Sequence, residues 1–342
     1  MQKTRIILWG LGAMGSGIYK VLNERTGVDL AGAIGRNPEK LGKDLGEALG
    51  LDKSGVIISS DAASVLKGAG PGTVIHSTGS FFKEIHQELM QSVRAGYNVI
   101  TIAEEMAEPW AADMVLADEL NEEAKKYGVT VLGTGINPGF VLDALAICLS
   151  GACCNVNKIE AERINDLSPF GRTVMATQGV GITPDEFHEG INKGTIVGHI
   201  GFKQSITLIA RALNWQLDKI EEEKEPIISS TKRETPYVKV EPGMVAGCHH
   251  RAYGYLNGKA VITLKHPQQV CPEAENVETG DYIRIDGTPP VNMSIKPEIP
   301  GGQGTMAMAA NMVPVVVSAS PGLKTLLDLP FPSCWSKFEQ AE

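Results

Sequence analysis

An alternation of short apolar runs with helix-like segments occupies residues 5–134 and limits the folds open to this 342-residue chain. The apolar runs are nearly continuous, as in strands of a sheet covered on both faces, and they lie at 5–9, 28–34, 55–59, 73–78, 98–103 and 129–134. The clearest helical segments, 83–96 and 111–128, each end in glycine shortly before the next run. Strands that alternate with helices predict an α/β fold with a Rossmann-type doubly wound parallel sheet.

A glycine-rich turn follows the first run, at the start of the first helical segment. Gly10, Gly12 and Gly15 have the spacing G-x-G-x-x-G. The first glycine permits a tight turn, the second lets a pyrophosphate approach the backbone, and the third allows helix and sheet to pack closely. We therefore predict a dinucleotide site with a loop of Gly10, Leu11, Gly12, Ala13, Met14 and Gly15. The alternative is a glycine-rich turn without a ligand.

The end of the second run bears on which nucleotide is bound. An Asp or Glu there would hold the ribose 2′-OH of NAD, but this chain has Gly35, followed by Arg36 and Asn37, with Lys40 nearby. Because a cation without an acid suits a 2′-phosphate, we expect NADP as the preferred cofactor, with NAD as the alternative. We assign Arg36 and Asn37 to cofactor binding; otherwise Arg36 is a solvated loop residue.

Ligands of such sheets bind beyond the carboxyl ends of the strands, so two further strand ends are informative. Small residues lie at and directly after the end of the fourth run, and we expect Ser77, Thr78 and Gly79 to line the path of the cofactor. Asn137 lies in the turn at 133–140, where it would hydrogen-bond the nicotinamide carboxamide or the substrate. The equal alternative is a turn that caps the next helix.

Two adjacent acids, Glu104 and Glu105, follow the fifth apolar run. Neighbouring side chains of an extended chain point in opposite directions, so we expect only one of them to face the crevice. A carboxylate beside a nicotinamide attracts an ammonium and takes its proton, so that the amine lone pair can expel hydride; it also activates water to hydrolyse the imine. This pair is the candidate catalytic base. The alternative is that both acids are solvated loop charges.

Beyond residue 138 the pattern becomes that of an antiparallel sheet with helices on one face. Period-two alternation at 158–168, an amphipathic segment at 200–215 and a hairpin turn at Asn257-Gly258 indicate an α+β domain. We expect a dinucleotide-binding domain at 1–137, an α+β substrate domain at 138–303, and a helical segment at 304–342 that returns to the first domain.

Charged and polar side chains of the second domain are candidates for substrate binding. An α-amino acid needs a cation or N–H donors for its carboxylate and an acceptor for its ammonium, and we assign these roles to Arg163, Asp166, Arg172 and His199. The alternatives are ion pairs, surface charges or, for His199, a core histidine. The rings of His249-His250 should point to opposite faces of a strand, without neighbours at metal-ligand spacing, so we expect no metal site.

Composition argues against two classes of partner, nucleic acid and membrane. A net charge of −9 argues against nucleic acid. The absence of a run of about 18 apolar residues argues against a membrane span. Because residues 5–9 already read as a strand and no charged and apolar leader precedes them, we expect no signal sequence. The 6 cysteines are sparse, so we expect reduced thiols in a cytoplasmic protein.

Taken together, six segments resemble the 2,4-diaminopentanoate dehydrogenase family, a relative of dihydrodipicolinate reductases and native amine dehydrogenases. They run in order along nearly the whole chain: WGLGAMGSGI, NPEKLGKDLGE, EEMAEPW, GTGINPGFVLDAL, GHIGFKQS and ASPGLKTLLDLP. The resemblance implies a homodimer that reversibly deaminates 2,4-diaminopentanoate at C4 to 2-amino-4-oxopentanoate, ammonia and NAD(P)H, in ornithine degradation. The resemblance also implies that residues 138–303 form the dimerisation domain and that the catalytic carboxylate belongs to the Glu104-Glu105 pair. Comparison with homoserine-dehydrogenase-like strands places it on Glu104 rather than Glu105.

Two departures from related sequences refine this hypothesis. Members that we expect to prefer NAD carry an acid where this chain has Gly35, which supports NADP. The pair His249-His250 lacks the following Lys of dihydrodipicolinate reductases, which argues against that reaction. The rival hypotheses are a related amine dehydrogenase or imine reductase acting on simple ketones and ammonia, and a non-catalytic sensor that binds NADP and a partner protein.

Overall fold

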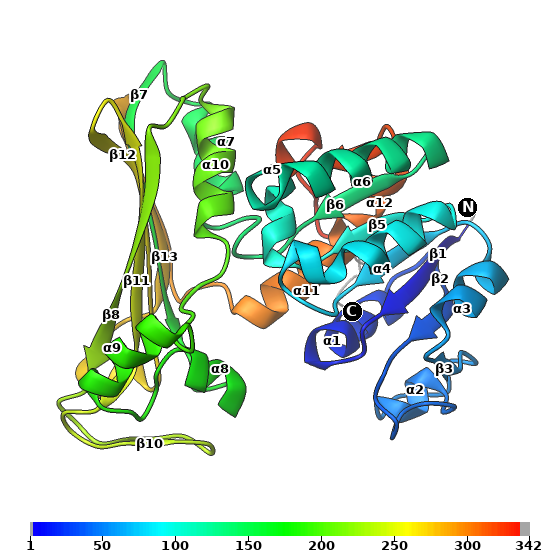
Figure 1. Cartoon of the computed structure of the whole chain (residues 1–342), viewed down its shortest axis with the longest axis horizontal. Coiled ribbons are helices and arrows are strands. Elements are labelled where there is room, and N and C mark those ends of the chain that lie inside the picture. Colours follow the sequence, from blue (N-terminus) through cyan, green and yellow to red (C-terminus); the bar gives the residue numbers. More distant parts are fainter. Residues whose placement is uncertain (1–2, 336–342) are drawn as a thin grey trace, which may run out of the picture. The chain divides into compact units, whose positions relative to one another are not determined.

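The computed structural model describes residues 3–335, which form two compact units (Figure 1). Unit 1 consists of the chain up to Gly139 and from Gly301 onward, and unit 2 of Phe140–Pro300. The divisions thus fall at 139 and 300, against boundaries of 137 and 303 in the sequence analysis. Within residues 3–335, none of the helices combines the length and apolar character that a membrane span requires.

Unit 1 is built on a seven-stranded sheet with the order β15-β6-β5-β4-β1-β2-β3. All its strand pairs are parallel. From β1 the chain winds outward to β3 on one side and, from β4, to β6 on the other, which is the doubly wound topology. The strands are β1 (Thr4–Trp9), β2 (Val28–Ile34), β3 (Ile58–Ser59), β4 (Thr73–His76), β5 (Asn98–Thr101), β6 (Thr130–Gly133) and β15 (Gly322–Lys324). The predicted Rossmann-type sheet is confirmed.

Helices cover both faces of this sheet, and local signals set where they begin and end. The side chain of Asp113 accepts from the first-turn N–H groups of α6, and Gly128 ends that helix in the left-handed conformation. The helices are α1 (Ala13–Asn23), α2 (Leu45–Ala48), α3 (Ala62–Ala69), α4 (Phe82–Arg94), α5 (Pro109–Ala112), α6 (Met114–Tyr127), α11 (Gly301–Asn311) and α12 (Val313–Ser318), with short 3₁₀ turns η1 (Glu104–Ala107) and η3 (Leu326–Asp328).

Two expected elements of unit 1 differ from the structure. Only Ile58–Ser59 of the run 55–59 forms a strand, because the preceding Val56 and Ile57 pair with Leu45 and Asp44 instead. The expected helical segment 304–342 is not helical throughout: after α12 it forms β15, which pairs with β6 and covers that edge of the sheet. Residues 336–342 of this segment lie outside the residues that the structure describes. Helix α11 packs closely on α1. A Cβ added to Gly17 of α1 would lie only 2.3 Å from the Met306 side chain of α11.

Unit 2 contains a six-stranded mixed sheet with the order β14-β13-β7-β12-β11-β8. Only β12 and β7 are parallel neighbours; the remaining pairs are antiparallel. Asn257 and Gly258 form the expected turn, with φ of 51° and 72°. The strands are β7 (Asn155–Asp166), β8 (Lys219–Ile228), β11 (Val245–Leu256), β12 (Lys259–Gln269), β13 (Gly280–Thr288) and β14 (Val291–Ile295), beside a small pair of β9 (Arg233–Glu234) and β10 (Lys239–Val240).

One face of the large sheet in unit 2 is covered by helices. Alternate residues of β7, among them Ile159 and Ala161, are buried on this face, which confirms the period-two pattern. The amphipathic segment at 200–215 forms α10 and packs on β11 and β12. The helices are α7 (Ala144–Ser150), α8 (Arg172–Thr177), α9 (Pro184–Lys193) and α10 (Phe202–Ala212), with a 3₁₀ turn η2 (Pro272–Glu275).

Candidate active site

The glycine-rich loop between β1 and α1 has the geometry that a dinucleotide needs. Gly10 has φ of +100°, and a Cβ there would lie 2.5 Å from the Ser77 carbonyl oxygen. A Cβ on Gly15 would lie 1.9 Å from the Gly10 oxygen, so strand and helix touch here. A Cβ on Gly12, by contrast, would meet no atom within 4 Å among residues 3–335. The backbone is therefore open at the position where a pyrophosphate would approach the start of α1.

The residues after β2 lie close to this loop. The backbone N–H of Gly35 donates to Ser59, and the side chain of Asn37 accepts from Glu39 N–H at 2.9 Å. The ammonium of Lys40 donates to the Leu11 carbonyl at 3.1 Å and so holds the glycine-rich loop. Arg36 is 80% exposed, and its guanidinium pairs with Glu88 of α4. The structure thus places the cation at the end of β2 but gives it an acidic partner.

The small residues after β4 also contact this region. Ser77 donates from its hydroxyl to the Gly10 carbonyl at 3.0 Å, which fixes the glycine-rich loop against the next strand. Thr78 donates to a carboxylate oxygen of Glu88 at 2.6 Å. Gly79 has little room, because a Cβ there would lie 3.1 Å from Ile85. Two of these three residues therefore have a structural function in addition to the binding role that we expect.

A cavity of about 340 Å³ lies at the carboxyl ends of β1, β2 and β3. Its lining residues are Trp9, Ile34, Arg36, Ser60, Asp61, Ala62, Ala63, Gln87, Glu88 and Gln91. Glu88 was not among the residues selected from the sequence. It lies in the middle of α4, where no turn, glycine or strand end distinguishes it from other helical acids.

Glu104 and Glu105 begin the 3₁₀ turn η1, so the expectation that they lie on extended backbone is wrong. The turn still separates them. The Glu105 carboxylate accepts from the Phe82 N–H at 2.7 Å, where a negative charge suits the N-terminus of α4. Glu104 is half-buried, and burial raises its pKa, while hydrogen bonds from its own N–H and from Ser80 lower it in part. Glu105 therefore has a structural partner, and Glu104 has the perturbed acidity typical of a functional carboxyl.

Asn137 lies in the turn between β6 and unit 2 and precedes a cis peptide bond to Pro138. The neighbouring Ile136 N–H donates to Thr305 of α11 at 3.2 Å, so this turn is fixed within unit 1. The next helix, α7, has Asp143 as its N-cap, which accepts from Ala144 N–H. The alternative in which Asn137 caps that helix is therefore wrong.

From their positions around the end of one strand, Arg163, Asp166 and Arg172 were expected to cluster, but the structure gives Arg163 and Asp166 separate partners. Arg163 and Asp281 are a buried ion pair, each 2% exposed, and the Arg163 guanidinium also donates to the Ile299 carbonyl. Asp166 accepts from the N–H and hydroxyl of Ser168 at 2.8 and 2.6 Å. Arg172 is exposed at the start of α8. The expectation of a cluster fails because β7 points the Arg163 side chain into the core, beside the acid of the neighbouring strand β13.

His199 precedes α10 and belongs to a cluster of aromatic rings. Its ring lies 4.8 Å from Phe202 and 4.9 Å from His266, measured between centroids. Burial, with the nearby His250 and Arg163, lowers the pKa of His199 to about 3, so the ring is neutral at physiological pH. Its Nε2 is buried and has no hydrogen-bond partner among residues 3–335. A neutral imidazole whose Nε2 has no partner is able to donate a hydrogen bond to a bound molecule or to accept one from it.

The histidine pair on β11 agrees with its expected orientation. His250 is buried, with Nδ1 accepting from His199 N–H and Nε2 next to Glu222, while His249 is half-buried on the other face. Across residues 3–335 no group of three or more His, Cys, Asp and Glu side chains is placed to hold a metal ion.

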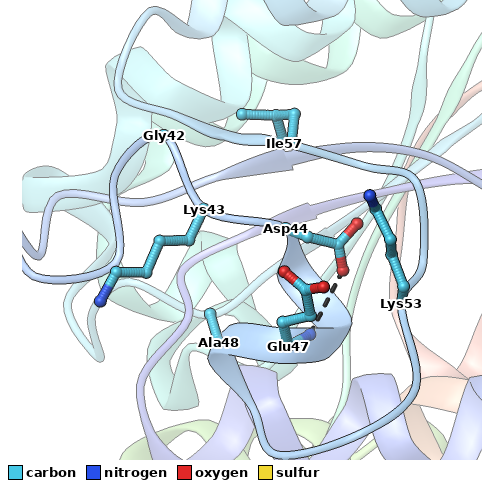
Figure 2. A pocket seen from close by; sticks show the side chains of 7 residues that line it. All are labelled: Gly42, Lys43, Asp44, Glu47, Ala48, Lys53 and Ile57. Atoms are coloured by element: carbon cyan, nitrogen blue, oxygen red, sulfur yellow. Dashed lines mark hydrogen bonds between the residues drawn. The ribbon is translucent and has the colours of Figure 1, made fainter.

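A second cavity, of about 560 Å³, lies beside the excursion between β2 and β3 (Figure 2). Its lining residues are Gly42, Lys43, Asp44, Glu47, Ala48, Lys53 and Ile57. Although burial would raise the pKa of Asp44, N–H groups of Ser54, Glu47 and Gly55 lower it to about 2. Because these hydrogen bonds hold the loop between β2 and β3 together, the Asp44 carboxylate has a structural role there.

Comparisons with known proteins agree with this geometry. Residues 140–341 match the family model of the 2,4-diaminopentanoate dehydrogenase C-terminal domain, and residues 4–99 that of the dihydrodipicolinate reductase N-terminus. A 2,4-diaminopentanoate dehydrogenase of Acetoanaerobium sticklandii is 43% identical over 97% of this chain and 95% of its own length. An amine dehydrogenase of Streptomyces virginiae is 22% identical over 95% of each chain.

A solved structure shares the fold of both units. The amine dehydrogenase from Mycobacterium smegmatis matches with a TM-score of 0.85 at 26% identity, covering 96% of this chain and 97% of its own. The full-length relative, the matched domain and the open glycine-rich loop lead to one conclusion: this chain is a dehydrogenase of the 2,4-diaminopentanoate dehydrogenase family.

Proposed function

We propose that this chain catalyses the reversible oxidative deamination of 2,4-diaminopentanoate at C4, a step of ornithine degradation. The C4 ammonium compound, oxidised nucleotide and water give 2-amino-4-oxopentanoate, an ammonium ion, reduced nucleotide and one proton. The observation that carries this substrate is the 43% identity, over 97% of the chain, to a protein named for the same reaction. The half-buried Glu104 at the end of β5 supplies a group suited to the chemistry.

The residues around the glycine-rich loop fit a nicotinamide dinucleotide. When bound, the nicotinamide ring accepts the hydride that leaves C4. Gly12 leaves room for the pyrophosphate, and the N-terminus of α1 offers N–H groups to it. Around it we assign Gly10, Leu11, Ala13, Met14, Gly15, Asn37, Ser77, Thr78, Gly79 and Asn137 to cofactor binding. With Gly35 in place of an acid and Arg36 exposed beside the cavity, we propose a preference for NADP, with NAD as the alternative cofactor.

Glu104 is the proposed catalytic base. Its ionised carboxylate attracts the substrate ammonium and removes one proton, which frees the nitrogen lone pair that drives hydride loss from C4. Protonated Glu104 then releases that proton to solvent, and the regenerated carboxylate takes a proton from the water that attacks and hydrolyses the imine. Burial, which raises the pKa of Glu104, also makes it a stronger base than an exposed glutamate. Glu105 supports the turn through Phe82 and is proposed as a positioning residue.

Unit 2 is the proposed substrate and dimerisation domain. We propose that Arg172 and Asp166 supply charge, and His199 an unused ring nitrogen, for the carboxylate and C2 ammonium of the substrate. Arg163 is left out of this site because its guanidinium is held by Asp281 and Ile299. We further propose that the chain acts as a homodimer in the cytoplasm, in line with its free cysteines.

A second candidate is an amine dehydrogenase that makes amines from simple ketones and ammonia. The amine dehydrogenase from Mycobacterium smegmatis supports it, with a TM-score of 0.85. Such an enzyme does not need groups for an amino-acid head, so the two candidates differ in substrate preference.

The deciding experiment follows NADPH consumption with ammonium and either 2-amino-4-oxopentanoate or 2-pentanone. The main proposal predicts a kcat/KM at least about 100-fold higher for the amino acid, because charged groups must be satisfied in its site. Equal or reversed preference would favour the second candidate. Tight nucleotide binding without turnover of either ketone would instead favour a sensor.

A further inference from the structure

We propose that Glu88 weakens the binding of NADP relative to NAD, mainly because its carboxylate repels the 2′-phosphate directly and to a small extent because it competes with that phosphate for Arg36. Glu88 is thereby a specificity-determining residue contributed by α4 and not by the end of β2, where such residues are usually sought. The inference rests on the proposed function only in requiring that this chain binds a nicotinamide dinucleotide.

The Glu88 carboxylate is held in place by three side chains, which come from the ends of β2 and β4. One oxygen pairs with Arg36, which follows β2. The other accepts from Thr78 at 2.6 Å and lies 2.8 Å from Nε2 of His76, the last residue of β4. His76 is fully buried, and its Nδ1 lies 3.1 Å from the Thr101 hydroxyl. This arrangement makes His76 an N–H donor to Glu88 through Nε2 and an acceptor through Nδ1.

The Glu88 carboxylate is therefore held in one position and kept ionised. Burial alone would raise the pKa of Glu88, but hydrogen bonds from His76 and Thr78, together with the Arg36 charge, lower it overall. The Glu88 side chain is 13% exposed, whereas that of Arg36 is 80% exposed. Arg36 is consequently able to leave the pair at little cost, as exposed ion pairs are weak, while Glu88 stays where its buried partners hold it.

Arg36 and Glu88 both line the cavity of about 340 Å³ at the carboxyl ends of β1, β2 and β3. In doubly wound sheets the ribose next to the adenine binds near the end of β2. A phosphate on that ribose carries about two negative charges at neutral pH. It would gain Arg36 but meet the remaining carboxylate of Glu88 in the same cavity. NAD carries an uncharged hydroxyl at that position, which Glu88 does not oppose.

Isothermal titration calorimetry of the full-length protein with NADP⁺ and NAD⁺ tests this proposal. The variants are Glu88→Gln, which keeps an oxygen for His76 and Thr78, and Arg36→Gln. The matched control is Glu123→Gln: Glu123 also pairs with an arginine, Arg94, at 2.8 Å and is 18% exposed, but it lies on α6 outside the cavity. We expect Glu88→Gln to lower the Kd for NADP⁺ about 10-fold and to change that for NAD⁺ by less than about 3-fold. The control should change neither.

Arg36→Gln provides an independent test that does not depend on the buried network. It should raise the Kd for NADP⁺ about 10-fold and leave Glu88 without its cation. Added salt then screens the repulsion, so the affinity ratio of NADP⁺ to NAD⁺ should rise with salt in this variant. A ratio that stays flat or falls would overturn the proposal, even if Glu88→Gln does not fold.

The remaining outcomes separate this proposal from the function itself. An unchanged or weaker affinity of folded Glu88→Gln for NADP⁺ overturns the role of Glu88 but leaves the enzyme function intact. A selective loss of NAD⁺ binding also overturns it, because Glu88 would then be an acceptor for the ribose hydroxyl. If the wild type binds neither nucleotide, both this proposal and the proposed function fail.

Discussion

Two arginine–carboxylate pairs, one in each unit, show how differently the same chemistry is used in this molecule. In unit 1, Arg36 extends into solvent and reaches back to Glu88 at the edge of a cavity. In unit 2, Arg163 and Asp281 join neighbouring strands β7 and β13 inside the core, where both side chains are 2% exposed. The first pair is open to exchange with a ligand, whereas the second is closed by the protein itself.

The difference teaches that the surroundings of an arginine, more than its charge, decide whether it binds a ligand. Breaking an exposed pair costs little because water replaces the lost partner. Breaking a buried pair leaves an uncompensated charge in the core. A sequence search for cations near expected strand ends finds both arginines, but only Arg36 is available.

The largest expected effect is on stability and concerns the buried pair. Arg163→Met should lower the free energy of unfolding by about 3–5 kcal/mol, because Asp281 is left buried without its partner. Arg36→Met should lower it by less than about 1 kcal/mol. Urea unfolding followed by circular dichroism measures both. Adding Asp281→Leu to Arg163→Met should restore most of the loss; equal effects of the two single variants would erase the distinction.

A smaller effect concerns acid, to which the histidine cluster makes unit 2 sensitive. Burial lowers the pKa values of His199, His250 and His266, with that of His199 falling to about 3. Below the ordinary histidine pKa these histidines bind protons in the unfolded chain but stay neutral in the folded chain. The free energy of unfolding therefore falls as pH decreases. Above that pKa both states are neutral and the effect vanishes. We expect His199 alone to contribute about 1 kcal/mol of loss per pH unit below about pH 6.

Unfolding measured at pH 7.5, 6.5 and 5.5 checks this dependence. His199→Asn should flatten the acid slope, while His188→Asn, on the exposed face of α9, should leave it unchanged. If the free energy of unfolding depends on pH equally in the wild type and both variants, His199 does not stay neutral in the folded chain at acid pH.

The smallest effect separates a residue that holds the loop from one that faces the phosphate. Lys40 donates to the Leu11 carbonyl within the glycine-rich loop. Lys40→Met should therefore raise the Kd values for NADP⁺ and NAD⁺ by the same factor, about 3-fold, through loss of one hydrogen bond. Titration calorimetry with both nucleotides measures it. A loss confined to NADP⁺ would instead make Lys40 a second partner of the phosphate.

Features of unit 1 that depend on backbone conformation could be predicted from the sequence. The roles of Gly10, Gly12 and Gly15 follow from their spacing after an apolar run, and the structure gives each the space its role requires. The strand β15 could not be predicted, because three residues become a strand only by pairing with β6. The 3₁₀ turn at Glu104 was missed because the preceding strand made an extended continuation the simplest expectation.

Side-chain partners distant in sequence explain most of the remaining differences. Arg36 and Glu88 are 52 residues apart, and Arg163 and Asp281 are 118 apart. No local pattern records such pairings, since they arise only when separate strands and helices pack. For this reason Glu88 was not selected from the sequence, and Arg163 was assigned to substrate binding although Asp281 and Ile299 hold its guanidinium.

The catalytic role of Glu104 is tested most directly by the pH dependence of kcat/KM in Glu104→Gln, with Glu105→Gln as its neighbour control. We expect Glu104→Gln to lower kcat/KM for oxidation of 2,4-diaminopentanoate by about 100-fold or more at unchanged nucleotide affinity. It should also abolish the rise in rate as pH increases through the raised pKa of Glu104. Glu105→Gln should retain that rise and lose less than about 10-fold. A Glu104→Gln enzyme with wild-type rate and pH profile would contradict this account.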